Sequence, residues 1–408
     1  MAKTVWTFNR GEWTEAYVFL RLLGNGKVYG ATSDLQKNPD VYVDIVNILR
    51  YDTEGLLKFE RENNQTVSAS LDGTDFKVIC CSELNEKADY LYQIIKNIGA
   101  AKRISISGIQ TYLEGLKFSQ AKAPKMPVSV ENRYGKKTDI IITAEDPVDH
   151  ARITEGFSIK SHIGDPSTLF NSATNSGLVY KIKGCNEYYM HKLNSIESET
   201  GIFEYIKNTD LSLEFSGSKS EAFSDNLDYI DLRMIEFINA VVLVQIGYYP
   251  KARSQKSKDI IEMVAELNPL NVKHPEKWYA AKFKDFLYAA FSGLTAIQPW
   301  DGHRKMSGGY IDVSKDGEIL YFRAMSDYIF SEYLYQNTFI DRPSRGVLKD
   351  VAQANAKAYL SCHTLSENEI TAVIYKDGKR KPKKGDWGYV YENNGSYYIA
   401  INFQIRFK

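Results

Sequence analysis

Two short segments, 138–145 and 155–161, constrain the fold of this chain more than any other feature of its sequence. Both are rich in β-branched and aromatic residues, and a polar connection separates them, so each predicts a strand. Asp139 opens the first segment and Lys160 lies near the end of the second. If the two strands pair in one sheet, the carboxylate of Asp139 and the ammonium group of Lys160 can come close together.

A carboxylate beside an ammonium group has a definite chemical use. The carboxylate oxygens can bind Mg²⁺, and the lysine can hold or deprotonate a water molecule, which predicts metal-assisted hydrolysis of a phosphodiester. The alternative is that Asp139 is merely a solubilising acid at a strand end. Lys160 favours the first interpretation, because a lysine between Phe157 and Ile159 in a half-buried strand is costly unless it has a partner.

The composition is that of a globular protein. The 408 residues, 43% hydrophobic and 25% charged, suffice for one large or two moderate domains. We expect neither a signal peptide nor a membrane span, because the N-terminus lacks the required pattern and the longest apolar stretch, 237–249, resembles a buried helix. The four cysteines form no CxxC and do not cluster with the six histidines, so we expect reduced thiols in a cytoplasmic protein and no zinc site.

The net charge is zero, yet the charges are segregated along the chain. Residues 95–137 carry nine Lys/Arg against two Asp/Glu, residues 196–236 carry three against ten, and residues 374–408 carry eight against three. Two basic segments, one of them adjoining Asp139, suit a polyanionic partner such as nucleic acid. Solvated surface charge is the alternative interpretation.

Periodicity and turn residues predict a mixed α/β (α+β) chain. We expect helices at 11–24, 84–97, 106–117, 228–248, 255–267 and 275–292. We expect strand pairs within 65–81, 309–323 and 387–407, each around a turn that contains glycine, with Cys80 and Cys81 adjacent on one strand. We assign 1–185 to a catalytic core, and 186–408 to a second lobe with a helical middle and a β-rich end that would serve recognition.

The position two residues before Lys160 is occupied by Ser158. In a nuclease site of the pattern D…(D/E)-x-K this position takes an acid, and a hydroxyl is a poor replacement for a carboxylate on Mg²⁺. A second acid should therefore come from elsewhere. Glu15 in the first predicted helix adjoins an apolar face and could point into the site. The alternative for Glu15, and for Glu12, is favourable charge in the first turn of a helix.

Further polar residues are candidates for contacts with nucleic acid. His162 lies two residues beyond Lys160 and could touch a phosphate or transfer a proton. The polar segment 164–177 looks like a loop, with room for one helical turn, whose side chains could bond base edges or phosphates, or simply cap a helix. The full set of candidate DNA-contacting residues is Lys136, Lys137, Ser161, His162, Ser167, Thr168, Asn171, Asn175, Arg304, Arg342, Ser344 and Arg345.

Several separated motifs make the chain resemble the HpaII-type family of type II restriction endonucleases. They occur in the family's order and span nearly the whole sequence. The motifs are Arg10-Gly11-Glu12-Trp13-Thr14-Glu15, Lys137-Thr138-Asp139-Ile140, Gly156-Phe157-Ser158-Ile159-Lys160-Ser161, Pro299-Trp300-Asp301-Gly302, Ser307-Gly308-Gly309-Tyr310-Ile311, Arg342-Pro343-Ser344-Arg345 and Asn402-Phe403-Gln404-Ile405-Arg406-Phe407.

The resemblance implies a PD-(D/E)XK nuclease core with a mixed central sheet flanked by helices. It also implies Mg²⁺-dependent cleavage of double-stranded DNA at CCGG. Asp139 corresponds to a metal ligand, Lys160 to the motif lysine and Glu15 to the acid of the first helix, with a main-chain carbonyl near Ile159 completing the metal site. The chain departs from the family pattern at Ser158 and in residues 346–386, which look like an insertion.

Two rival functions stay open from the sequence. One is a DNA-binding protein that does not cut, built on a decayed nuclease core, and the other is a repair nuclease that reads DNA structure. A palindromic target must be cut on both strands, which favours a homodimer. A cognate DNA methyltransferase is expected in the same system, but not as a bound subunit.

Overall fold

The computed structural model describes most of the 408 residues. The described residues are 4–32, 36–98, 102–164, 166–171, 176–196, 198–302, 308–323, 327–341 and 388–407. They form two compact units, Met1–Ser167 with Arg304–Tyr333, and Thr168–His303 with Leu334–Lys408. Within these ranges no helix combines the length and the apolar character needed to cross a bilayer.

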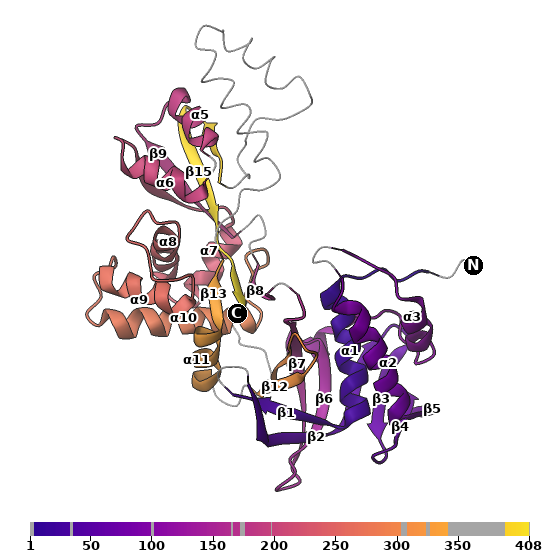
Figure 1. The fold of residues 1–408 in the computed structure, drawn as a ribbon. Coiled ribbons are helices and arrows are strands. Elements are labelled where there is room, and N and C mark those ends of the chain that lie inside the picture. The colour runs from indigo at the N-terminus through magenta and orange to yellow at the C-terminus, as the bar shows by residue number, and fades with distance from the viewer. Residues whose placement is uncertain are drawn as a thin grey trace. The chain divides into compact units, whose positions relative to one another are not determined.

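The first unit is built on one sheet, which contains nine strands among the described residues (Figure 1). Their order across the sheet is β1-β12-β11-β7-β6-β2-β3-β4-β5. The strands are β1 (Lys27–Ala31), β2 (Lys37–Asp52), β3 (Gly55–Arg61), β4 (Thr66–Leu71), β5 (Thr74–Cys80), β6 (Ile140–Glu145), β7 (Arg152–Ser161), β11 (Gly309–Val313) and β12 (Ile319–Arg323).

The two predicted strands that carry Asp139 and Lys160 do pair. β6 and β7 are antiparallel, with Ile140 opposite Phe157. On its other side β7 pairs in parallel with β11, where Ile311 lies opposite Ile159. The first unit thus includes β11 and β12, which the sequence analysis placed in the second lobe, because these strands continue the sheet beside β7.

The predicted hairpins form as expected. β4 and β5 pair around Asp72-Gly73, β11 pairs with β12, and β14 (Val390–Asn393) pairs with β15 (Ser396–Asn402). Asn394 and Gly395, which join β14 and β15, have positive φ angles of 51° and 72°, respectively. A tight hairpin turn needs this backbone geometry, and Asn-Gly is the sequence that adopts it most readily.

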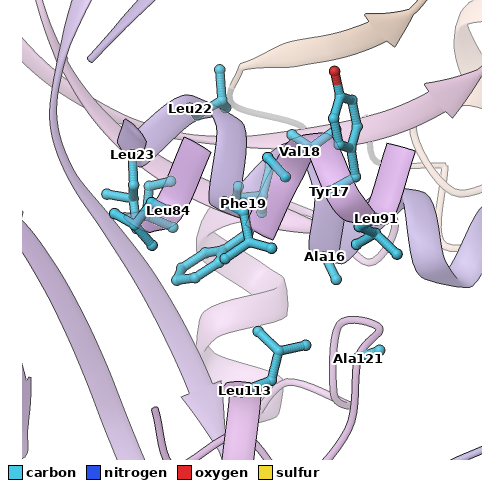
Figure 2. Packing of buried hydrophobic residues seen from close by; sticks show 14 of the residues in the cluster. Ala16, Tyr17, Val18, Phe19, Leu22, Leu23, Leu84, Leu91, Leu113 and Ala121 are labelled. Atoms are coloured by element: carbon cyan, nitrogen blue, oxygen red, sulfur yellow. The ribbon is translucent and has the colours of Figure 1, made fainter. Parts of the chain in front are cut away.

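The helix α1 (Arg10–Asn25) is the main cover of this sheet near the site. Asn9 caps it through a reciprocal capping box with Glu12, and Gly26 ends it with a φ of 71°. Figure 2 shows its apolar side chains packed with Leu84 and Leu91 of α2 (Cys81–Ile95). The close approach of the two helices depends on Gly24, where a Cβ would lie 2.5 Å from the Asn85 side chain.

Two shorter helices complete the first unit, α3 (Ser107–Glu114) and α4 (Val128–Tyr134). The predicted helices at 11–24, 84–97 and 106–117 are therefore confirmed to within a few residues. The placement of Cys80 and Cys81 on one strand was wrong. Cys80 is exposed at the end of β5, whereas Cys81 is buried as the first residue of α2.

The second unit combines helices with two small sheets, ordered β10-β9-β15-β14 and β13-β16-β8 among the described residues. Its further strands are β8 (Thr168–Phe170), β9 (Gly177–Lys183), β10 (Ser212–Ser218), β13 (Thr338–Ile340) and β16 (Ile405–Phe407). Its helices are α5 (Glu187–Ser195), α6 (Glu199–Lys207), α7 (Glu221–Asp228), α8 (Met234–Gln245), α9 (Ser257–Leu267) and α10 (Pro275–Phe291), and α11 (Asp327–Asn337) contains the boundary between the units.

Two expectations for this unit need correction. The helix predicted from residue 228 begins at Met234, because Ile230 and Met234 donate backbone hydrogen bonds that close turns before it. Within the segment predicted as a loop, β8 forms a short strand, because Leu169 and Phe170 are buried where β8 pairs with β16. The mixed α+β class expected from the sequence is confirmed.

Candidate active site

Asp139 is held at the junction of β6 and β7. Its backbone N–H donates to the carbonyl of Phe157 at 2.9 Å, which places it one residue before β6 in the ladder. Its carboxylate oxygen Oδ2 accepts hydrogen bonds from the backbone N–H of Ile159 at 2.7 Å and from the hydroxyl of Ser158 at 3.1 Å. The carboxylate is thus clamped across the two strands in a fixed orientation.

Lys160 interacts electrostatically with Asp139 and belongs to the same cluster of charged side chains. Burial lowers the pKa of its ammonium group, and the negative charges of Asp139 and Glu15 act in the opposite direction. Burial likewise raises the pKa of the Asp139 carboxyl, opposed first by the charge of Lys160. The structure therefore brings together the acid and the lysine that the sequence placed on separate strands.

Glu15 of α1 is the second carboxylate of the cluster. It accepts a hydrogen bond from the backbone N–H of Ala123. Burial and then the negative charge of Asp139 raise its pKa to about 8, against the effects of the Ala123 N–H, Arg50 and Lys122. Two carboxylates that repel each other in a buried site favour proton uptake or the binding of a cation.

Glu12, the other acid considered for this role, has structural contacts instead. It completes the capping box with Asn9. It also forms ion pairs with Lys122 at 2.8 Å and Arg103 at 3.1 Å. The geometry therefore favours Glu15 over Glu12 as the acid of the first helix that belongs to the cluster.

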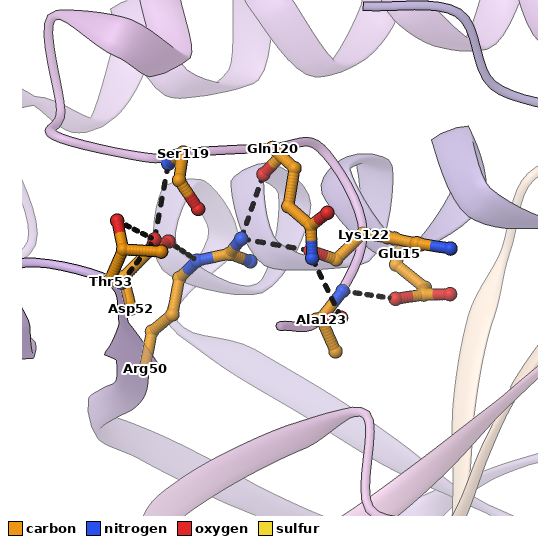
Figure 3. Close-up of polar contacts among 8 residues, drawn as sticks. All are labelled: Glu15, Arg50, Asp52, Thr53, Ser119, Gln120, Lys122 and Ala123. Atoms are coloured by element: carbon orange, nitrogen blue, oxygen red, sulfur yellow. Dashed lines mark hydrogen bonds and ion pairs between the residues drawn. The ribbon is translucent and has the colours of Figure 1, made fainter. Parts of the chain in front are cut away.

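A polar network that was not predicted from the sequence supports Glu15 (Figure 3). Arg50 of β2 contacts Asp52 at 2.7 Å and donates to the carbonyls of Gln120 and Lys122 at 2.7 and 2.8 Å. These bonds hold the loop whose next residue, Ala123, donates to Glu15. Arg50 and Asp52 are two residues apart on one strand, so their side chains lie on the same face. This spacing was the sequence signal from which their ion pair could have been predicted.

Lys137 is the second lysine of the cluster. It is half-buried, whereas its neighbour Lys136 is exposed. Burial and then the positive charge of Lys160 lower the pKa of Lys137 to about 7, while Asp139 acts in the opposite direction. From the sequence, both lysines were expected only as contacts for DNA. The structure adds that Lys137 belongs to the same electrostatic cluster as Asp139 and Lys160.

The two residues that follow Lys160 contact other parts of the first unit. The hydroxyl of Ser161 accepts a hydrogen bond from the hydroxyl of Thr14 at 3.3 Å. Nε2 of His162 lies 2.6 Å from Oδ1 of Asp312, and both side chains are largely buried. Asp312 was absent from the sequence-based candidates, and its Cα lies opposite that of Lys160 in the β7–β11 register. The contacts with DNA proposed for Ser161 and His162 stay predictions.

The remaining candidates lie farther along the chain. Thr168 is half-buried in β8, Ser167 is half-buried just before it, and Asn171 is exposed just after it. The other candidate positions, and the segment 346–386, lie outside the described residues. These positions are Asn175, Arg304, Arg342, Ser344 and Arg345.

The donor atoms of the cluster suit a hard divalent cation. Glu15 and Asp139 both line one pocket and offer carboxylate oxygens, the ligands that Mg²⁺ prefers. Burial, and after it the repulsion by Asp139, raises the pKa of Glu15, and a bound cation would relieve that repulsion. Across the described residues no group of three His, Cys, Asp or Glu side chains converges on one point, so such an ion would need main-chain or water ligands as well.

Comparison with known proteins finds a matching family and a similar protein. A family model described as HpaII restriction endonuclease matches residues 9–361. The type II restriction enzyme HpaII of Haemophilus parainfluenzae is 30% identical over 408 residues, covering 98% of each chain. No solved structure matches the chain, so the PD-(D/E)XK core stays a prediction.

Proposed function

Since this chain belongs to the HpaII restriction endonuclease family and is a type II site-specific endonuclease, we propose that it hydrolyses double-stranded DNA in a Mg²⁺-dependent reaction at CCGG. One observation supports the location of the chemistry above all others. The carboxylate of Asp139 is clamped by Ser158 and Ile159 in the same half-buried cluster as Lys160 and Glu15. This cluster is the centre of a PD-(D/E)XK-type site in our proposal.

The carboxylates of Asp139 and Glu15, with the main-chain carbonyl of Ile159, would hold the Mg²⁺ ion. When bound, such an ion neutralises charge on the phosphate and makes a coordinated water more acidic. The hydrogen bonds to Asp139 orient its carboxylate before the substrate arrives. The Ala123 N–H does the same for Glu15. Preorganisation of this kind saves reorganisation during the reaction.

Lys160 would orient the attacking water and stabilise the negative charge on the oxygens around the pentavalent phosphorus in the transition state. Its burial supports this role, because a charge in a site of low dielectric acts more strongly than one in water. Ser158 occupies the place of the missing acid and contributes through Asp139 rather than as a ligand of its own.

Residues outside this cluster would bind DNA and recognise its sequence. Exposed basic residues of the segment 95–137, such as Lys136, would follow the phosphate backbone. Polar residues around Thr168, and the arginines at 304, 342 and 345, would contact bases. CCGG reads the same on both strands, so two copies of the chain would act as a homodimer in the cytoplasm, with the protecting methyltransferase a separate protein.

Digestion of plasmid DNA with purified protein and Mg²⁺ tests the function. We expect discrete fragments whose sequenced ends all lie at CCGG. A gel shift without any cleavage would favour the non-cutting DNA-binding protein. Fragments whose ends share no sequence would favour a structure-specific nuclease. Ends at one fixed sequence other than CCGG would correct the target but leave the activity in place.

A further inference from the structure

Arg10 is the first residue of α1, and its guanidinium group makes no hydrogen bond or ion pair within the part of the chain that the structure describes. Its Nε atom is nevertheless buried. Glu12, the acid nearest to it in the sequence, is paired with Arg103 and Lys122 instead. A buried polar atom without a partner is uncommon in folded proteins, so the side chain of Arg10 needs an explanation.

Gly164, three residues beyond the end of β7, makes room for this side chain. A Cβ added at Gly164 would collide with the Nη1 atom of Arg10. The φ angle of Gly164 is not positive, so the backbone conformation alone does not require glycine at this position. Glycine here therefore serves the placement of the guanidinium group.

Arg10 and Gly164 lie beside the proposed active site. The hydroxyl of Thr14, one helical turn after Arg10, lies 2.9 Å from the carbonyl oxygen of Arg10 and 3.3 Å from the hydroxyl of Ser161. Ser161 directly follows Lys160 in β7. Four residues of extended chain span at most about 14 Å, which is therefore the largest separation between the Cα atoms of Lys160 and Gly164.

From these observations we propose that Arg10 binds a phosphate of the DNA backbone close to the scissile phosphate, and that Gly164 positions it. The proposal rests on the proposed function, because Lys160 marks the scissile phosphate only in an endonuclease. The N–H donors of a guanidinium group match the oxygens of a phosphate, so DNA would supply the missing partner. DNA rises about 3.4 Å per nucleotide along each strand, which places the contacted phosphate within a few nucleotides of the cleaved bond.

Binding of a short CCGG duplex in the presence of a chelator tests Arg10 without relying on cleavage. Arg10→Met removes the charge and keeps an aliphatic side chain, so fluorescence anisotropy should show binding weakened roughly tenfold. The slope of log affinity against log salt should become shallower by about one, because one phosphate contact is lost. The matched control is Arg152→Met at the other end of β7, where an exposed arginine already pairs with Glu145, and its affinity should match the wild type.

Gly164→Ala tests the placement of the guanidinium group separately. The added methyl group displaces the arginine without removing its charge, so binding should weaken about as much as in Arg10→Met. The double variant should bind no more weakly than Arg10→Met alone, because both changes remove the same contact. A double variant with additive losses would show that Gly164 does not act through Arg10.

Duplexes that carry one neutral methylphosphonate linkage locate the contact. With each phosphate neutralised in turn, one position near the cleaved bond should weaken binding by the wild type and leave binding by Arg10→Met unchanged. At this position the two proteins should bind with equal affinity, because the partner of Arg10 is missing from the DNA.

Two results would overturn the role of Arg10. One is a folded Arg10→Met variant that binds the duplex as tightly as the wild type, with the same salt dependence. The other is that no single methylphosphonate removes the difference in affinity between the two proteins. Plasmid digestion by the wild type is scored separately. If the wild type cuts DNA while the binding results go against Arg10, this proposal fails and the proposed function stands. Wild-type protein that neither binds nor cuts DNA would refute both.

Discussion

The hydroxyl of Ser158 donates a hydrogen bond to the carboxylate of Asp139 at 3.1 Å, across strands β6 and β7. The D…(D/E)-x-K pattern would place an acid at Ser158, directly beside Asp139. A hydroxyl at this position donates a hydrogen bond to the neighbouring carboxylate, whereas a second carboxylate would repel it. The substitution therefore fits a site in which Glu15 from α1 provides the other acidic ligand.

Ser158→Ala should weaken the site without destroying it. The variant loses one hydrogen bond to a charged acceptor, while the N–H of Ile159 still holds Asp139 at 2.7 Å. We expect single-turnover cleavage to slow by roughly tenfold, the usual effect of losing a hydrogen bond to a charged group. An unchanged rate would show that the Ser158 bond does not position Asp139 during the reaction.

Asp139→Asn and Lys160→Met should each abolish cleavage and leave DNA binding in place. Both variants are close to the native side chains in size, so the buried site should stay packed. We expect a loss of about a thousandfold or more, since each residue would act directly on the reacting phosphate. Cleavage rates and gel-shift affinities should be measured on the same preparations. Undiminished cutting by either variant would refute the assignment of the site.

Glu15→Gln should change the pH dependence of stability in protein treated with a chelator. The folded-state pKa of Glu15 is raised from 4.5 to about 8, so between these values the folded protein holds a proton that the unfolded chain has lost. The stability of the wild type therefore falls as pH rises through this window. Glutamine resembles the protonated acid and avoids the penalty.

Urea unfolding at two pH values checks this prediction. At pH 8 the Glu15→Gln variant should be more stable than the wild type by on the order of a few kcal/mol, and at about pH 4.5 the two should be nearly equal. Added Mg²⁺ should stabilise the wild type more than the variant at pH 8. If the variant is no more stable than the wild type at pH 8, burial and the charge of Asp139 do not raise the pKa of Glu15 in this way.

The strands, and the proximity of Asp139 to Lys160, could be predicted from the sequence because residues close together in the chain determine them. The β-branched stretches around Ile141 and Phe157 alternate with polar residues only at their ends, and Asp72-Gly73 marks a turn by itself. Pairing two such neighbouring strands needs no knowledge of distant segments. The amino-acid sequence alone is therefore enough to predict that Asp139 and Lys160 lie together.

The rest of the site depends on contacts between distant segments. Asp312 reaches His162 only because β11, far along the chain, joins the sheet beside β7. Arg50 supports Glu15 only through the loop at Gln120. Nothing in the local sequence distinguishes half-buried Lys137 from exposed Lys136, since burial is decided by the fold. Such contacts need the assembled tertiary structure.

Arg50 provides a test of how far the support of Glu15 extends (Figure 3). Its guanidinium group binds Asp52, whose side chain is fully buried, and two carbonyls of the loop that precedes Ala123. Arg50→Met would leave the Asp52 carboxylate buried without its cation. Breaking a buried pair in this way costs about 3–5 kcal/mol, and the loop that holds Glu15 should loosen as well.

The matched control is Lys58→Met on the next strand. Lys58 and Glu60 have the same spacing as Arg50 and Asp52, but their side chains are 39% and 40% exposed. Removing one partner of an exposed pair should cost less than about 1 kcal/mol. Urea unfolding measures the loss of stability in each of the two variants. Cleavage by Arg50→Met should be slower than cleavage by the wild type at temperatures where the variant is still folded. If Arg50→Met costs no more than Lys58→Met, or cuts DNA as fast as the wild type, the network does not position Glu15.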